Sequence, residues 1–184
     1  MKDALYSLDV VAADALDRAA RAEIIELCEA AYEENFTRLF ELLRGSVHVL
    51  ARDEHGALVS HAEWVERWLQ PAELPPLRTA YVESVATAPD RRAQGLATAV
   101  LRRAAEVIAA DHGWELGALS PSDFGFYARL GWELWRGPLA IRRADGIEPT
   151  PPDEQVMILR LPRTPPALIT TALLTAEWRE GELW

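Results

Sequence analysis

The sequence predicts one mixed α/β domain with a largely antiparallel sheet, and three observations support this prediction. The chain has 184 residues, enough to bury roughly 70% of the surface that it exposes when unfolded, so one self-sufficient core is expected. An amphipathic helical pattern comes early, because apolar residues recur at helical spacing soon after the N-terminus. Strand-like runs follow it and further helices come late, an order typical of mixed α/β or α+β folds.

Local patterns place the individual elements. Helices are expected where apolar residues form one stripe, with Asp14 capping the first and Ser122 or Asp123 capping a later one. Strands are expected where apolar residues alternate with polar ones, as over 46–51, in apolar-rich runs such as 57–69, and in runs of strand-favouring residues such as 77–87. A polar turn at 53–56 predicts a β-hairpin. The expected elements are strands over 5–11, 46–51, 57–69, 77–87, 114–119, 132–135 and 156–161, and helices over 14–34, 36–43, 95–111 and 124–130. Pro-rich connections are expected over 71–76 and 148–152, and the tail, 167–184, is expected to be part helix and part extended.

The charge balance excludes several classes of partner. The chain has 19 Lys and Arg against 29 Asp and Glu, a net charge of −10. Nucleic acids and anionic membranes both require a basic face, so neither is expected to bind, whereas a cationic small molecule suits an acidic protein. No apolar run approaches the roughly 20 residues needed to cross a membrane, and the first nine residues lack the apolar core of a signal peptide. We therefore expect a soluble, cytoplasmic protein.

The chain is not expected to bind a metal or to use a serine nucleophile. Cys28 is the single cysteine, so neither an intramolecular disulfide nor a thiolate zinc cluster can form, and a buried position on a helix is expected. The four histidines are scattered without metal-ligand spacing and are interpreted as strand, turn and helix-end residues: His48, His55, His61 and His112. No Gly-x-Ser-x-Gly motif surrounds Ser120.

The segment with the clearest chemical signal is a strand, a turn and the start of a helix over residues 81–97. A Gly- and Ala-rich turn that opens a helix presents unpaired backbone N–H groups and the helix dipole to an anion. Arg91 and Arg92 add positive charge nearby, so the segment predicts a pyrophosphate site. It matches neither the Walker loop nor the Rossmann fingerprint. The alternative is an ordinary helix N-terminus with two solvated arginines.

This turn resembles that of the GNAT superfamily of acyl-CoA-dependent N-acetyltransferases. Its pattern, Q/R-x-x-G-x-G/A, is met by Arg92-Ala93-Gln94-Gly95-Leu96-Ala97. Four further parts of the chain are similar to the aminoglycoside 2′-N-acetyltransferases, a group within that superfamily. These parts are residues 81–86, residues 116–120, Tyr127 with Gly131-Trp132, and the terminal residues 177–184. The resemblance covers essentially the whole chain. It implies a GNAT fold with a splayed central strand pair flanked by helices, acetyl-CoA as cofactor, and a homodimer.

The resemblance also implies roles for individual residues. Transfer to an amine requires a neutral nitrogen, so a base must take a proton, and Glu83 matches that position. Tyr127 matches the tyrosine that protonates the leaving thiolate. The alternatives are a solvated Glu83 and a Tyr127 with a role only in the core. The implied cofactor contacts are the backbone of Val85 and Thr87, together with Arg91, Arg92, Ala93, Gln94, Gly95, Leu96 and Ala97.

A polycationic acceptor requires a site lined with carboxylates. The implied acceptor contacts are Asn35, Glu83, Ser120, Asp153, Glu154, Glu182 and the α-carboxylate of Trp184. The expected function is acetylation of the 2′-amine of aminoglycosides, which weakens their attraction to RNA phosphates and confers resistance. Two alternatives remain open at this point: a GNAT enzyme for another amine, such as a polyamine, an amino sugar or a peptide N-terminus, and a non-catalytic module that binds acyl-CoA.

Overall fold

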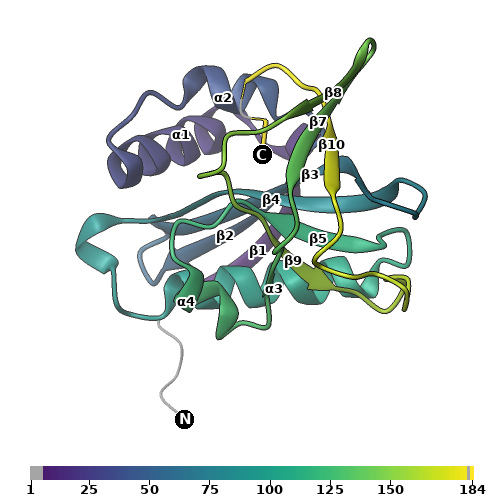
Figure 1. The fold of residues 1–184 in the computed structure, drawn as a ribbon. Coiled ribbons are helices and arrows are strands. Elements are labelled where there is room, and N and C mark those ends of the chain that lie inside the picture. The colour runs from purple at the N-terminus through teal and green to yellow at the C-terminus, as the bar shows by residue number, and fades with distance from the viewer. Residues whose placement is uncertain (1–5, 182) are drawn as a thin grey trace. The chain divides into compact units, whose positions relative to one another are not determined.

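The computed structural model describes residues 6–181 and 183–184, and the chain divides into two compact units. Unit 1 comprises Met1–Val65 and Val82–Val107, and unit 2 comprises Glu66–Tyr81 and Ile108–Trp184. Two long strands, β3 (Leu58–Pro71) and β4 (Leu77–Thr87), each contribute residues to both units (Figure 1). Each unit is described by itself below.

Unit 1 contains antiparallel strands and three helices, the last of which continues beyond the unit. The strands β1 (Tyr6–Ala12) and β2 (Val47–Asp53) are antiparallel, and β2 forms a hairpin with β3 in which Val47 lies opposite Trp64. The helices of this unit are α1 (Arg18–Tyr32), α2 (Thr37–Leu42) and most of α3 (Leu96–Ala110), with 3-10 turns over Ala13–Ala15 and Pro89–Arg91. The predicted hairpin and the three helices are confirmed.

The start of α1 differs from the prediction. Asp14 lies in the 3-10 turn, and the residue that caps α1 is Asp17, whose carboxylate accepts a hydrogen bond from the backbone N–H of Ala20 at 2.7 Å. The backbone at Leu16 is extended, which interrupts the helix. The helical spacing of apolar residues in the sequence therefore begins before the helix itself, which starts at Arg18. The apolar stripe of α1 packs into the core of unit 1, where Ile24 and Cys28 are fully buried, as expected for Cys28.

Unit 2 contains the remaining strands and one short helix. Its elements are β5 (Leu116–Leu119), α4 (Phe124–Ala128), β6 (Glu133–Leu134), β7 (Leu139–Arg143), β8 (Gly146–Pro149), β9 (Met157–Arg160) and β10 (Leu174–Glu177). The strand order is β6-β9-β5-β4-β3-β10-β7-β8. β5 runs parallel to β4 and β10 runs parallel to β7, whereas the pairs β5–β9, β6–β9, β7–β8 and β10–β3 are antiparallel. The mixed, mostly antiparallel α/β class is therefore confirmed.

Two expectations about unit 2 are wrong. The stretch expected as a Pro-rich connection begins inside β8, which pairs with β7 as a hairpin. All four β8 residues are exposed, as is possible in a strand at the edge of a sheet. Because no face of β8 is buried, its sequence lacks the alternation of apolar and polar residues that predicts a strand. The tail contains β10 and, within its described residues, no helix. No helix formed by residues 6–181 and 183–184 combines the length and the apolar character that crossing a membrane demands.

Candidate functional site

In unit 1 the strand β4 is distorted next to Glu83. Ser84 has a φ of 51°, a left-handed conformation that is uncommon for any residue other than glycine, and it lies inside the strand. Two hydrogen bonds hold the backbone there: His61 Nδ1 donates to the Ser84 carbonyl at 3.0 Å, and the Tyr32 hydroxyl donates to the Val85 carbonyl at 2.7 Å. The half-buried Glu83 side chain therefore projects from a fixed, irregular segment.

The turn that follows β4 forms a cradle at the start of α3. Ala93 and Gly95 adopt left-handed conformations, with φ of 61° and 81°. A Cβ at Gly95 would meet no atom within 4 Å, so the backbone conformation and not crowding favours glycine there. A cavity of about 450 Å³ lies beside this turn, and it is lined in part by Gly95, Arg102 and Arg103. The helix N-terminus and the two arginines suit an anionic group.

The other cofactor candidates on this segment are partly engaged within the protein. Arg91 pairs with Asp53 at 3.2 Å, and Arg92 Nη2 donates to the carbonyl of Ala31 near the end of α1 at 2.8 Å. The two arginines therefore link the cradle to neighbouring elements of unit 1. Thr87 Oγ1 lies 2.9 Å from Ser60 Oγ. Gln94 is exposed, Leu96 is buried and Ala97 is half-buried.

In unit 2 the candidate acid, Tyr127, lies on the short helix α4. Asp123 caps this helix by accepting a hydrogen bond from the backbone N–H of Phe126 at 3.0 Å, as predicted. Tyr127 is 5% exposed, and its ring makes an edge contact with that of Trp132. Burial raises the pKa of Tyr127 above its usual value of 10.0. The hydroxyl thus keeps its proton at neutral pH, as a proton donor must.

The acceptor candidates differ in exposure. Asn35 is exposed in unit 1 between α1 and α2. In unit 2, Ser120 is exposed directly after β5, and Asp153 and Glu154 are exposed shortly before β9. Glu182 lies outside the described residues. Trp184 is 4% exposed, so the aromatic end of the chain is buried.

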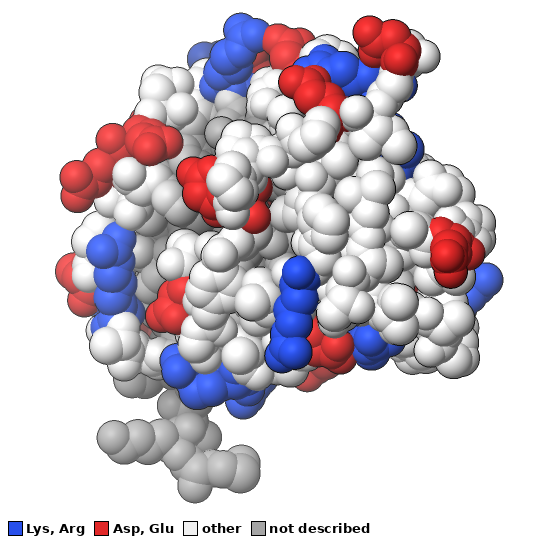
Figure 2. All heavy atoms as spheres, in the orientation of Figure 1, with Lys and Arg blue, Asp and Glu red and all other residues white. Residues whose placement is uncertain are grey.

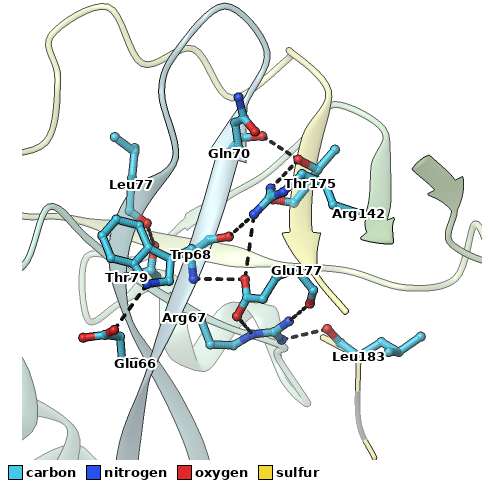
Figure 3. Close-up of polar contacts among 10 residues, drawn as sticks. All are labelled: Glu66, Arg67, Trp68, Gln70, Leu77, Thr79, Arg142, Thr175, Glu177 and Leu183. Carbon is cyan, nitrogen blue, oxygen red and sulfur yellow. Dashed lines mark hydrogen bonds and ion pairs between the residues drawn. The ribbon is translucent and has the colours of Figure 1, made fainter. Parts of the chain in front are cut away.

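The tail of unit 2 is held by a buried arginine that the sequence analysis missed. Arg67 on β3 is 1% exposed, and its guanidinium donates to the carbonyls of Leu183 at 2.7 Å and Glu177 at 2.8 Å (Figure 3). The Glu177 carboxylate also accepts from Arg67 Nε at 3.3 Å and from the backbone N–H of Trp68 at 3.0 Å. No local pattern marked Arg67, because β3 also contains other polar residues such as His61, Glu63 and Glu66.

A second missed feature is a buried polar cluster on the β2–β3 hairpin of unit 1. The expectation that the histidines are scattered is wrong for two of them, because His48 Nδ1 lies 3.0 Å from His61 Nε2. Burial lowers the pKa of His48 to about 4 and that of His61 to about 3, and it raises the pKa of Glu63 to about 7. The signal lay in the hairpin register, which places His48 directly opposite Glu63.

Charges of both signs are interspersed on the face of the molecule drawn in Figure 2. The blue side chains are arginines, because Lys2, the single lysine, lies outside the described residues. Among the described residues several arginines are salt-bridged, such as Arg143 with Glu148 and Arg160 with Glu133.

Comparison with known proteins identifies the family. Residues 14–135 match the family described as an acetyltransferase (GNAT) domain. An aminoglycoside 2′-N-acetyltransferase of Mycolicibacterium fortuitum is 37% identical over 186 residues, which cover 98% of this chain and 93% of that protein.

Solved structures support the same fold. The GNAT family N-acetyltransferase YhbS of Escherichia coli, solved in complex with CoA, has a TM-score of 0.66 at 16% identity, covering 98% of this chain and 94% of that one. Eis1 of Mycobacterium abscessus has a TM-score of 0.60 at 21% identity; the match covers 73% of this chain but only 33% of Eis1. The chain, with its confirmed α/β fold and its cradle at the start of α3, belongs to the GNAT acetyltransferase family and is an acyltransferase.

Proposed function

We propose that this acetyltransferase transfers the acetyl group of acetyl-CoA to the 2′-amine of an aminoglycoside. The observation that carries the proposal is the 37% identity to the Mycolicibacterium fortuitum aminoglycoside 2′-N-acetyltransferase over 98% of the chain. The order of the tail supports it as well, because Arg67 holds the segment that ends in Trp184. We further propose that the two units work together as one domain.

The cradle of unit 1 fits the cofactor. When bound, acetyl-CoA supplies an activated acetyl thioester and several phosphates. The left-handed turn at Ala93 and Gly95 and the N-terminus of α3 suit the pyrophosphate, since both expose backbone N–H groups. Arg102 and Arg103, which line the adjacent cavity, provide further positive charge. The backbone N–H groups near Val85 are the proposed partners of the thioester end.

Proton transfer is assigned to two side chains. Glu83 is the proposed base, because an ammonium ion is not nucleophilic and the half-buried carboxylate can take its proton directly or through water. Tyr127 is the proposed acid, and its buried hydroxyl gives its proton to the sulfur of the departing thiolate. The amine attacks the acetyl carbon directly, so no covalent enzyme intermediate forms.

Acceptor binding is assigned to polar groups from both ends of the chain. Asp153, Glu154 and Glu182 would attract a polycation, and the α-carboxylate of Trp184 adds a further negative charge. Asn35 and Ser120 provide neutral hydrogen bonds. An acetyltransferase for another amine is the second candidate. The resemblance to aminoglycoside 2′-N-acetyltransferases leads us to expect acidic residues where this chain has Asn35 and Phe40, so two negative charges are missing from the proposed acceptor side.

Two substrates that differ at one position test the proposal. Purified protein with acetyl-CoA is given aminoglycosides that carry either an amine or a hydroxyl at the 2′ position, together with a panel of polyamines, amino sugars and peptides. We expect release of free thiol with the 2′-amine and at least a hundredfold slower release with the 2′-hydroxyl. Turnover of another amine alone would support the second candidate, and binding of CoA without any turnover would support a non-catalytic module. The homodimer and the cytoplasmic location stay predictions.

A further inference from the structure

A fully buried set of titratable side chains lies on one face of the β2–β3 hairpin in unit 1. His48 and Glu63 are direct cross-strand partners, and His61 lies two residues before Glu63 on the same face of β3. All three residues are 0% exposed. The proposed acetyl transfer uses none of them, so the cluster requires another explanation.

The three side chains direct possible ligand atoms at one another. His48 Nδ1 lies 3.0 Å from His61 Nε2 and 3.6 Å from Glu63 Oε2, and all three atoms are within 4.8 Å of one another. In a tetrahedral zinc site with bonds of about 2.0–2.2 Å, neighbouring ligand atoms are about 3.3–3.6 Å apart. The distance of 3.0 Å from His48 Nδ1 to His61 Nε2 is slightly shorter than this range. The distance of 3.6 Å from His48 Nδ1 to Glu63 Oε2 lies at its upper end. The two pairs that include His48 Nδ1 therefore need to change by only a few tenths of an ångström to suit one ion, and the third pair is within 4.8 Å.

The outward nitrogen of each imidazole is already held in place. His61 Nδ1 donates to the carbonyl oxygen of Ser84 at 3.0 Å, so in the neutral ring Nε2 has the lone pair, which faces His48 Nδ1 in the cluster. His48 Nε2 lies 2.9 Å from the hydroxyl of Ser46. Metal-binding histidines usually have their second nitrogen hydrogen-bonded in this way, because the bond fixes the tautomer and the ring orientation.

Glu63 supplies the independent observation that indicates a cation. Neither of its carboxylate oxygens has a well-formed hydrogen bond in the described part of the chain; the hydroxyls of Ser46 and Ser84 interact with it without reaching that geometry. A buried carboxylate whose neighbours form no well-formed hydrogen bond with it is costly, and buried charges in proteins are generally paired or bound to a metal. A cation beside Oε2 would remove this cost.

We propose that His48, His61 and Glu63 bind one divalent transition-metal ion, with zinc the best match to the ligands. Two imidazole nitrogens and one carboxylate oxygen are typical zinc ligands, whereas magnesium and calcium prefer oxygen alone. Cys28 is not among the ligands, since its Sγ lies 3.9 Å from His61 Nδ1, the nitrogen that faces Ser84. The ion would join β2 to β3 and, through the bond from His61 to Ser84, support the distorted segment beside Glu83.

Metal titration of the whole protein tests the site. The chain is unfolded in urea with a chelator, refolded without it, and titrated with zinc by calorimetry and with cobalt by visible absorption. We expect one equivalent of either ion to bind with a dissociation constant of micromolar or below, cobalt to give the absorption bands of a tetrahedral site, and zinc to raise the melting temperature. Failure of both ions to bind at micromolar concentration would overturn the proposal and leave a metal-free pair that shares a proton between His48 and His61.

Substitutions locate the ion. His48→Gln and Glu63→Gln should each weaken zinc binding at least tenfold, and Ser46→Ala should weaken it less, because Ser46 contacts His48 and Glu63 but is not itself a ligand. The matched control is His55→Gln, a histidine in the same hairpin whose side chain is 78% exposed, and this variant should bind zinc as the wild type does. Circular dichroism establishes which variants fold. Unchanged binding in a folded His48→Gln variant would place the ion elsewhere and contradict the assignment.

Discussion

The guanidinium of Arg67 on β3 donates to the backbone carbonyl of Leu183, the second-last residue of the chain, at 2.7 Å. The two residues are 116 positions apart, and Arg67 is almost fully buried. A terminal segment is usually mobile unless it is tied down, and this hydrogen bond, with those to Glu177, ties it down in unit 2. Arg67 therefore holds the end of the tail, in addition to the pairing of β10 with β3 and β7.

Replacing Arg67 with Met should lower both stability and activity toward the acceptor. The change removes a buried cation that makes hydrogen bonds to Leu183 and Glu177, and because Glu177 is 37% exposed the remaining carboxylate can be hydrated. We expect a loss of about 2–3 kcal/mol in the free energy of unfolding, measured in urea. The control is Arg143→Met, whose exposed pair with Glu148 should contribute at most about 1 kcal/mol. Equal losses in the two variants would show that burial of Arg67 is unimportant.

Deleting Trp184 should impair acceptor use selectively. The side chain is buried and its carboxylate is a proposed acceptor contact, so the KM for the aminoglycoside should rise at least tenfold while the affinity for CoA stays within twofold. Steady-state kinetics and calorimetry measure the two effects. Trp178→Ala, in the same tail but exposed, is the matched control and should change the KM little. A deletion variant with an unaltered KM would remove Trp184 from the acceptor site.

The two left-handed positions of the cradle should respond oppositely to exchange of alanine and glycine. Gly95→Ala places a Cβ on a backbone with φ of 81°, which costs roughly 1–2 kcal/mol and should weaken CoA binding about tenfold. Ala93→Gly relieves the same backbone strain, at φ 61°, but glycine gives the unfolded chain more conformational entropy, and the two effects oppose each other. The free energy of unfolding of this variant should therefore stay within about 1 kcal/mol of the wild type. Calorimetry with CoA and thermal unfolding compare the pair. Wild-type affinity in Gly95→Ala would argue against binding of the cofactor at this turn.

Glu83→Gln should reduce kcat by about a hundredfold or more. The amide keeps the shape of the side chain but cannot accept the proton of an ammonium ion, so the loss falls on turnover and not on CoA binding. Rates of thiol release at saturating substrates measure it. Glu54→Gln, in the exposed turn between β2 and β3, serves as the control. If Glu83→Gln turns over at the wild-type rate, another group is the base.

The pH profile should report the state of Tyr127. The active form is the protonated acid, so activity is present below the pKa and is lost as pH rises through it. Because burial raises the pKa of Tyr127 above 10.0, kcat should show no decline from this group up to about pH 9.5. Tyr127→Phe should lower kcat by about a hundredfold at pH 7. A wild-type decline near pH 8 that disappears in Tyr127→Phe would mean that the hydroxyl has a lowered pKa, against this account.

The predictable part of the fold is the part with a clear periodicity. Residues 46–51 alternate apolar and polar side chains, a polar turn and an apolar-rich run follow, and these features predicted the β2–β3 hairpin. β4 has the bounds expected from its β-favouring residues. The exposed edge strand β8 has no such alternation, and β7 is too short to show one. Both strands are formed through pairing with neighbours, which local sequence does not reveal.

The candidate site shows the same division. Roles for Glu83 and Tyr127 could be predicted because they match a family pattern, and these roles stay predictions. A helix cap at Ser122 or Asp123 could be predicted because a cap leaves a local signature, and the structure shows that it is Asp123. Arg67 and Glu63 lie on β3, most of whose residues are buried on both faces, so alternation does not tell which side chains meet. Their partners lie across a hairpin or more than 100 residues away, and only the strand register brings them together.

The position of the acetyl group on the product tests the central proposal most directly. An aminoglycoside with several amines is incubated with the protein and acetyl-CoA, and the product is analysed by two-dimensional NMR and mass spectrometry. We predict one added acetyl group, attached to the nitrogen at the 2′ position. Acetylation at a different amine, or an aminoglycoside recovered unchanged while acetyl-CoA is consumed with another acceptor, would contradict the account.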